Sequence, residues 1–166
     1  MPTRTPIAVI GIGNEFRRDD GLGRAVVARL RERAAERPLP AGTVLATCDG
    51  DPARLIGLWE GSDLAVVVDA AHTHPAHPGR VHRLALDADA LDRPRTTSSH
   101  GLGLGEAVEL ARALGRLPGR LVGYAVEGAD SALGTGLSAS VEAVVEPLAE
   151  DIEDEIVRHR DAAARS

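Results

Sequence analysis

The stretch Ile7-Ala-Val-Ile-Gly-Ile-Gly-Asn-Glu-Phe-Arg-Arg-Asp-Asp-Gly-Leu-Gly23 decides the fold that we expect for this chain. Its first six residues are small or β-branched and apolar, which is typical of a strand buried on both faces of a parallel sheet. Gly11 and Gly13 allow a sharp turn where that strand ends. An acidic pair, Asp19 and Asp20, then precedes a helix.

The acidic pair has three interpretations. Asp19 or Asp20 can cap the following helix by accepting hydrogen bonds from its free N–H groups, which is the usual role of aspartate at such a place. A dinucleotide site is the second, because Gly11-x-Gly13 follows a strand. The third glycine of that motif would fall at Phe16, however, and the acidic pair would repel a pyrophosphate. The third interpretation is a metal-binding or proton-transferring carboxylate, which needs other ligands at the same edge of the sheet.

Composition narrows the classes of function. The 166 residues fit a single domain over residues 1–166, with a polar tail that we expect to be frayed from about residue 159. A net charge of −6 argues against a nucleic-acid partner. The single cysteine, Cys48, excludes an internal disulfide and fits a reducing compartment. We recognise neither a signal peptide nor a membrane span, and therefore expect a cytoplasmic protein with no membrane partner.

Apolar patterning predicts the order of strands and helices. Strands are expected at residues 7–12, 43–48, 64–68, 81–86 and 120–127, and helices at 20–37, from Pro52, from about His100 to Leu114, and at 141–156. The strand at 81–86 carries charged residues that favour an edge position. The alternation predicts an α/β fold, namely a three-layer α/β/α sandwich with a five-stranded, mostly parallel sheet.

Three side chains are expected at the carboxyl edge of that sheet: Asp20, Asp69 and His100. Asp69 ends the most hydrophobic run, Leu64–Val68, where an aspartate is either a turn residue or a ligand. A histidine at the start of a helix has a lowered pKa, which favours the neutral imidazole that binds metals. Two carboxylates and one imidazole form an incomplete shell that suits a first-row transition metal with open positions.

Other metal-binding and nucleophilic side chains have simpler explanations. His72, His74 and His77 resemble a metal-binding tract by composition, but two prolines make the segment a surface loop, where histidines are usually solvated. Its role stays open. Cys48 is expected to be a buried strand residue rather than a nucleophile, because no base is evident near it in the sequence.

Three segments in this order, Gly11–Gly23, Val67–Ala70 and Ser99–Leu104, resemble the nickel-iron hydrogenase maturation endopeptidases. The likeness continues through Gly123–Glu127 and Gly136–Val141, so it covers nearly the whole chain. The resemblance implies an endopeptidase that removes a C-terminal extension from the hydrogenase large-subunit precursor once the nickel-iron centre is loaded.

The resemblance also implies roles for individual residues. Asp20, Asp69 and His100 correspond to the metal-binding residues of the family, and Asp49, in an Asp-Gly after the second strand, to an auxiliary polar or catalytic group. We expect the three ligands to recognise nickel carried by the precursor rather than held permanently by the enzyme. Asp49 or Asp69 could then act as general base. Alternatively, the metal polarises the scissile carbonyl and activates water.

Two other functions remain open on the sequence. A non-proteolytic nickel-binding accessory protein for hydrogenase assembly would use the same ligands, and cleavage of a loaded precursor would distinguish it from a peptidase. A small-ligand domain that binds phosphate at the glycine turn is disfavoured by the acidic pair. No oligomeric state follows from the sequence.

Overall fold

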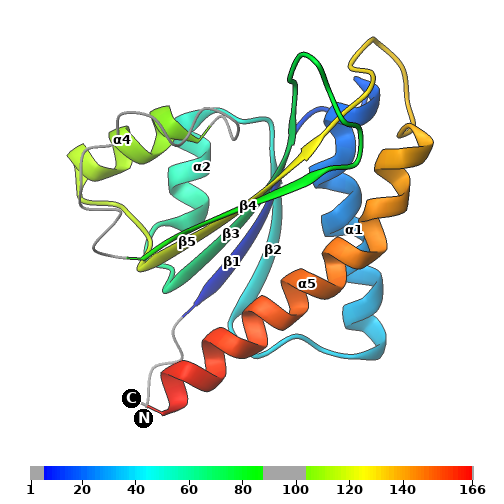
Figure 1. Ribbon diagram of the computed structural model, residues 1–166. Helices are drawn as coiled ribbons and strands as arrows, with labels where there is room; N and C mark the ends of the chain where they lie inside the picture. The colour runs from blue at the N-terminus through cyan, green and yellow to red at the C-terminus, as the bar shows by residue number, and fades with distance from the viewer. Residues whose placement is uncertain (1–5, 88–103, 166) are drawn as a thin grey trace.

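The computed structural model describes residues 6–87 and 104–165, which form a five-stranded sheet between two layers of helices (Figure 1). The predicted α/β fold is confirmed. The elements are β1 (Ile7–Ile12), η1 (Arg18–Gly21), α1 (Leu22–Glu36), β2 (Thr43–Cys48), α2 (Pro52–Trp59), β3 (Leu64–Ala71), β4 (Val81–Leu86), α4 (Gly105–Leu114), β5 (Arg120–Glu127) and α5 (Ala139–Ala164).

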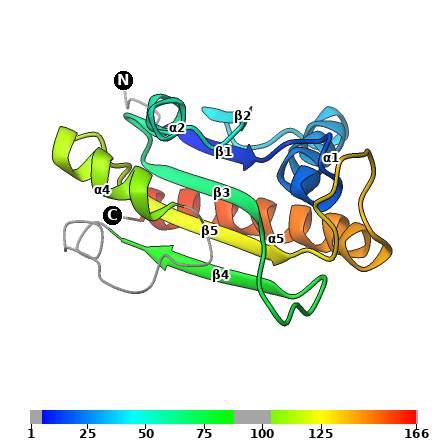
Figure 2. The ribbon, with the colours of Figure 1, turned by 90° about the horizontal axis from the view of Figure 1, so that it is seen from above.

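The sheet has the order β2-β1-β3-β5-β4, and β4 is the predicted edge strand. β4 runs antiparallel to β5, whereas the other strand pairs are parallel. Seen from above, α1 and α5 cover one face of the sheet, and α2 and α4 cover the other (Figure 2). The carboxyl ends of β1, β2, β3 and β5 therefore meet at one edge.

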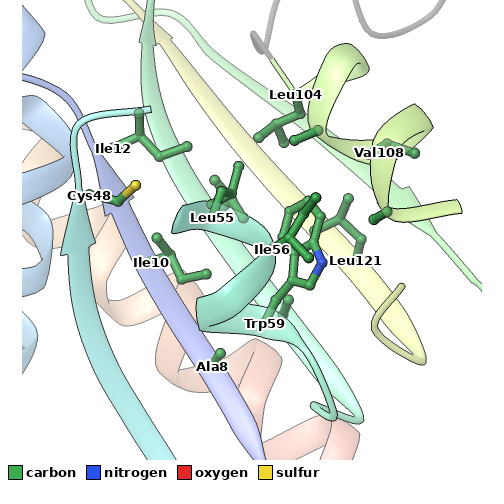
Figure 3. Packing of buried hydrophobic residues seen from close by; sticks show 14 of the residues in the cluster. Ala8, Ile10, Ile12, Cys48, Leu55, Ile56, Trp59, Leu104, Val108 and Leu121 are labelled. Carbon is green, nitrogen blue, oxygen red and sulfur yellow. The ribbon is translucent and has the colours of Figure 1, made fainter. Parts of the chain in front are cut away.

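Each face of the sheet packs against its own hydrophobic cluster. In β3, Val66 and Val68 belong to the cluster under α1 and α5, while Ala65 and Val67 belong to the cluster under α2 and α4. Figure 3 shows the second cluster, in which Trp59 is fully buried and its Nε1 donates a hydrogen bond of 3.0 Å to the Arg116 carbonyl. Because the sheet is covered on both faces, near-continuous apolar runs form its central strands.

A close contact between backbones sets the position of α1. A Cβ atom added to Gly23 would lie 2.5 Å from the Ile12 carbonyl oxygen and 2.6 Å from the Val68 carbonyl oxygen. Likewise, a Cβ on Gly11 would lie 2.2 Å from the Gly23 carbonyl oxygen. The first turn of α1 thus rests directly on the ends of β1 and β3, which brings the preceding η1 to the carboxyl edge of the sheet.

We predict that Gly23→Ala destabilises the protein by about 2 kcal/mol or more, since the added Cβ would meet backbone atoms of Ile12 and Val68, which cannot move aside as a flexible side chain would. Gly57→Ala is the control, because nothing lies within 4 Å of a Cβ at that position of α2. It should raise stability by roughly 0.5–1 kcal/mol, as alanine is the better helix former. Urea unfolding of both variants measures the difference, and equal stabilities would contradict the packing argument.

The capping interpretation of the acidic pair is wrong. Neither Asp19 nor Asp20 caps α1: the helix starts at Leu22, and its N-cap is Gly21, which makes no side-chain capping bond. The residues from about 159 on belong to α5, which is helical to Ala164. There the His159 ring contacts Asp63, and the Arg160 guanidinium donates a 2.6 Å hydrogen bond to the carbonyl of Ala41.

None of the helices in the described part of the chain combines the length and the apolar composition that crossing a membrane requires.

Candidate functional site

Asp69 lies near the carboxyl end of β3, where its side chain is mostly shielded from water. Its Oδ1 accepts a 2.8 Å hydrogen bond from the backbone N–H of Ala70. Burial raises the pKa of Asp69 to about 7; the Ala70 hydrogen bond opposes this shift, and the nearby negative charge of Asp20 adds to it. The structure thus brings two of the predicted ligands close enough for the negative charge of Asp20 to raise the pKa of Asp69.

Asp20 lies in η1, above the ends of β1 and β3. Its Oδ2 accepts a 2.8 Å hydrogen bond from the backbone N–H of Asn14. Its Oδ1 lies 3.6 Å from Nε2 of His72, the first residue after β3. About a quarter of the Asp20 side chain is exposed (24%). The Asp20 carboxylate therefore lies near both His72 and Asp69 and has access to solvent.

Asp19 has a different role from its neighbour. It is fully buried and accepts four hydrogen bonds: from the backbone N–H groups of Ala129 (2.8 Å), Asp130 (3.0 Å) and Ser138 (2.7 Å), and from the Ser138 hydroxyl (2.8 Å). Burial alone would raise the pKa of Asp19, but these hydrogen bonds outweigh it and lower the pKa. Asp19 holds η1 against the loop before α5 and thereby fixes the position of Asp20.

Glu127, at the end of β5, holds the loop that contains His72, His74 and His77 by hydrogen bonds, as Asp19 holds the loop before α5. Its carboxylate accepts hydrogen bonds from the Thr73 hydroxyl (2.8 Å) and the His77 backbone N–H (3.0 Å), and lies 2.7 Å from Nε2 of His82. These contacts lower the pKa of Glu127 to about 2, and the hydrogen bond from the His77 N–H has the largest lowering effect. The loop that follows β3 is therefore attached to β5 through a buried carboxylate that stays ionised.

Asp49 follows β2 at the same edge of the sheet and is exposed. Its Oδ1 accepts a 3.2 Å hydrogen bond from the backbone N–H of Asp51, whose own side chain caps α2 by accepting a bond from the N–H of Arg54. One strand, β1, separates β2 from β3. The preceding Cys48 is buried with 1% exposed surface, in agreement with the expected strand residue.

The third predicted ligand, His100, lies outside the described residues. Within residues 6–87 and 104–165, no group of three His, Cys, Asp or Glu side chains is close enough to hold a metal ion. The donors nearest the predicted site in this part of the chain, the carboxylates of Asp20 and Asp69 and the imidazole of His72, do not form such a group. Oxygen and imidazole nitrogen are donor types that suit a first-row transition metal, nickel included, but the described residues alone form no coordination shell.

Sequence reasoning missed three contributions to this edge. The anchoring roles of Asp19 and Glu127 and the proximity of His72 to Asp20 all depend on partners that are distant along the chain. A signal was present for Asp19, since two consecutive carboxylates before one helix cannot both serve as its N-cap.

Comparisons with known proteins agree on one family. A sequence profile described as "Hydrogenase maturation protease" matches residues 25–155. The hydrogenase maturating endopeptidase HybD from E. coli is 26% identical over 89% of this chain and 90% of that chain, with a TM-score of 0.71. A [NiFe] hydrogenase maturation protease HybD from Thermococcus kodakarensis, 23% identical over 92% and 99% of the two chains, has the same fold with a TM-score of 0.68. No curated protein matches the chain.

Proposed function

Because this chain belongs to the hydrogenase maturation protease family and is therefore a peptidase, we propose that it removes the C-terminal extension of a nickel-loaded hydrogenase large-subunit precursor. The observation that carries the proposal is the carboxylate pair of Asp20 and Asp69 at the carboxyl edge of the sheet, where open α/β folds bind ligands. The peptidase character of the family argues against the non-proteolytic accessory protein.

Recognition of nickel is the role that we propose for Asp20, Asp69 and His100. Three ligands leave positions on the ion for donors from the precursor, whose own thiolates would hold the nickel. Such a site would detect whether the precursor contains nickel, because the full coordination shell of the ion forms only when both proteins contribute ligands. The nickel in this proposal is a part of the substrate.

Proton transfer during peptide hydrolysis is assigned to Asp69, with Asp49 as the second candidate. A general base works best when its pKa lies near the working pH, and the pKa of Asp69, about 7, meets that condition. Asp69 would take a proton from the attacking water in this mechanism. We further propose that the reaction takes place in the cytoplasm, since the free, buried Cys48 fits a reducing compartment.

We predict that cleavage requires nickel in the precursor and that nickel added to the protease does not replace it. Two carboxylates and an imidazole select nickel only weakly over zinc or copper, so the selection must come from an ion already seated in the precursor. The measurement is a processing assay with chelator-treated protease on precursor made with and without nickel, in which cleavage appears as a shortened subunit.

Efficient cleavage of the nickel-free precursor would contradict nickel recognition. Since the protease in this assay has been stripped by chelator, the remaining explanation would then be a carboxylate mechanism with Asp49 and Asp69. If only untreated protease cleaves the nickel-free precursor, the explanation is a metallopeptidase that polarises the carbonyl with its own ion.

A further inference from the structure

Arg24 lies in the first turn of α1, and its side chain reaches the turn that follows β1. Its Nε donates a 2.7 Å hydrogen bond to the Gly13 carbonyl, and its Nη1 donates a 3.1 Å bond to the hydroxyl of Thr47 in β2. Because the donors of a guanidinium lie in one rigid plane, two acceptors hold the group in a single orientation. Arg24 therefore connects α1 to the carboxyl ends of β1 and β2.

The Gly13 carbonyl and the Asn14 N–H belong to one peptide group, which lies between Arg24 and Asp20. The carbonyl accepts the bond from Arg24, and the N–H donates a 2.8 Å bond to Oδ2 of Asp20. Since a trans peptide is planar, its C=O and N–H point in opposite directions. A cation at the carbonyl polarises the group and strengthens the bond that its N–H donates. Arg24 thereby acts on the Asp20 carboxylate through a single peptide group.

Gly13 makes the orientation of this peptide depend on hydrogen bonds. The Gly13 N–H donates a 3.0 Å bond to the Cys48 carbonyl, which fixes the preceding side of the residue. Its φ is +137°, and an added Cβ would lie 1.9 Å from the Asp20 carbonyl oxygen, so glycine is required here. The backbone of glycine rotates more freely than that of other residues. The peptide after Gly13 therefore needs a contact of its own, and Arg24 provides one.

We propose that Arg24 is a positioning residue of the candidate site: it orients the Gly13–Asn14 peptide so that the Asn14 N–H holds the Asp20 carboxylate in place. The expected effect on cleavage rests on the proposed function, in which Asp20 recognises the nickel of the precursor. The hydrogen bonds themselves lie within this chain and are measurable without a precursor. Without Arg24 the peptide turns about Gly13, and Asp20 loses the donor that fixes its Oδ2.

The direct test is amide hydrogen exchange at Asn14, followed by NMR in the full-length, metal-free protein. Arg24→Met keeps a long apolar side chain but removes the charge and the donors. It should accelerate exchange at Asn14 by about tenfold or more, because hydrogen bonds to charged groups contribute factors of this size. Arg24→Lys keeps the charge and a donor for the Gly13 carbonyl, and should bring exchange at Asn14 to within about threefold of the wild-type rate.

Arg31→Met is the matched control. Arg31 is also an arginine of α1 that bonds to β2, since its Nη2 donates a 3.2 Å hydrogen bond to the Leu45 carbonyl, but it does not contact the turn after β1. Its replacement should leave exchange at Asn14 within about twofold of the wild-type rate. Exchange at Val9, in the middle of β1, should stay unchanged in Arg24→Met, whereas general loosening of the fold would accelerate it.

Precursor cleavage gives a second measurement. Arg24→Met should raise the KM for nickel-loaded precursor by about tenfold and leave kcat within about threefold of the wild-type value. The reason is that the proposed function assigns recognition to Asp20 and proton transfer to Asp69, and a loss of binding alone appears in KM.

An exchange rate at Asn14 that stays within about twofold of wild type in Arg24→Met would overturn the proposal, and so would equal acceleration in Arg24→Lys or in Arg31→Met. If exchange is unchanged while the wild-type enzyme cleaves loaded precursor, the proposed function stands and the positioning role of Arg24 fails. If exchange at Asn14 responds as expected but the wild-type protein cleaves no precursor, the positioning role stands and the proposed function fails.

Discussion

Asp69→Asn is expected to abolish precursor cleavage and, in the metal-free enzyme, to increase stability at pH 8. The amide keeps the shape of the side chain, and its oxygen can still accept the 2.8 Å hydrogen bond from Ala70. The asparagine side chain carries no charge, so it cannot serve as a base. For the same reason it avoids the energetic cost of burying a carboxylate beside the charge of Asp20. Loss of activity and gain of stability in one variant is the pattern of a functional group held in an unfavourable environment.

The pH dependence of this gain in stability follows from the raised pKa of Asp69. Well below pH 3.8, the ordinary pKa of the group, Asp69 is protonated in both the folded and the unfolded chain, so the variant and the wild type should be equally stable, and at pH 4 they should differ only slightly. As the pH rises toward 7, the unfolded chain loses this proton while the folded protein keeps it, and the wild type loses stability. Above pH 7 the gain from Asp69→Asn should reach its full size, on the order of 1–3 kcal/mol.

Urea unfolding at pH 4 and pH 8 measures the effect, and Asp49→Asn is the control. Asp49 is an exposed carboxylate at the same edge, and its replacement should change stability by less than about 0.5 kcal/mol at either pH. The control also distinguishes the two candidate bases, because retained cleavage in Asp49→Asn leaves Asp69 as the base. A variant of Asp69 that cleaves at the wild-type rate, or that is less stable at pH 8, would contradict the assignment.

Asp19→Ala is expected to destabilise the protein by about 3–5 kcal/mol and to remove activity with it. The substitution leaves three backbone N–H groups and one hydroxyl without their acceptor. Each buried unsatisfied group costs about 1–3 kcal/mol, and water that enters the space left by the side chain reduces this cost. A loss of this size is a large share of the stability of an ordinary domain. Asp20 would lose its position because the adjacent residue no longer holds η1.

Asp130→Ala is the control for this variant. Asp130 lies in the same loop, but its side chain is half exposed (50%) and forms a 3.5 Å ion pair with Arg18 on the surface. Its replacement should cost at most about 1 kcal/mol. Thermal unfolding of the two variants compares them directly, and similar midpoints would show that the buried bonds of Asp19 contribute little.

The sheet could be predicted from the sequence because local patterns encode it. The run Leu64–Val68 is apolar throughout and became the central strand β3, and the charged 81–86 segment became the antiparallel edge strand β4. Even the cap of α2 was predictable, since Asp51 and Pro52 are adjacent in the sequence and act locally.

The supports of the candidate site could not be predicted in this way. Asp19 bonds to Ala129 and Ser138, which are 110 and 119 residues away, and Glu127 bonds to Thr73, 54 residues away. No local sequence pattern indicates hydrogen-bond partners this far along the chain. For this reason the capping role that is usual for an aspartate before a helix was the wrong interpretation of Asp19. The placement of Asp20 and Asp69 at one edge followed from the topology, whereas the position of His100 stays a prediction.

The bond between Asp19 and Ser138 also has a consequence for the order of events during synthesis. Since 119 positions separate these residues, ribosomes must translate most of the chain before η1 can be fixed. At about 5–20 residues per second, several seconds pass in which the turn that carries Asp20 has no bond to the loop before α5. On the proposed function, a nascent chain would therefore have no assembled site with which to bind nickel, and recognition of the precursor would begin only when α5 has docked.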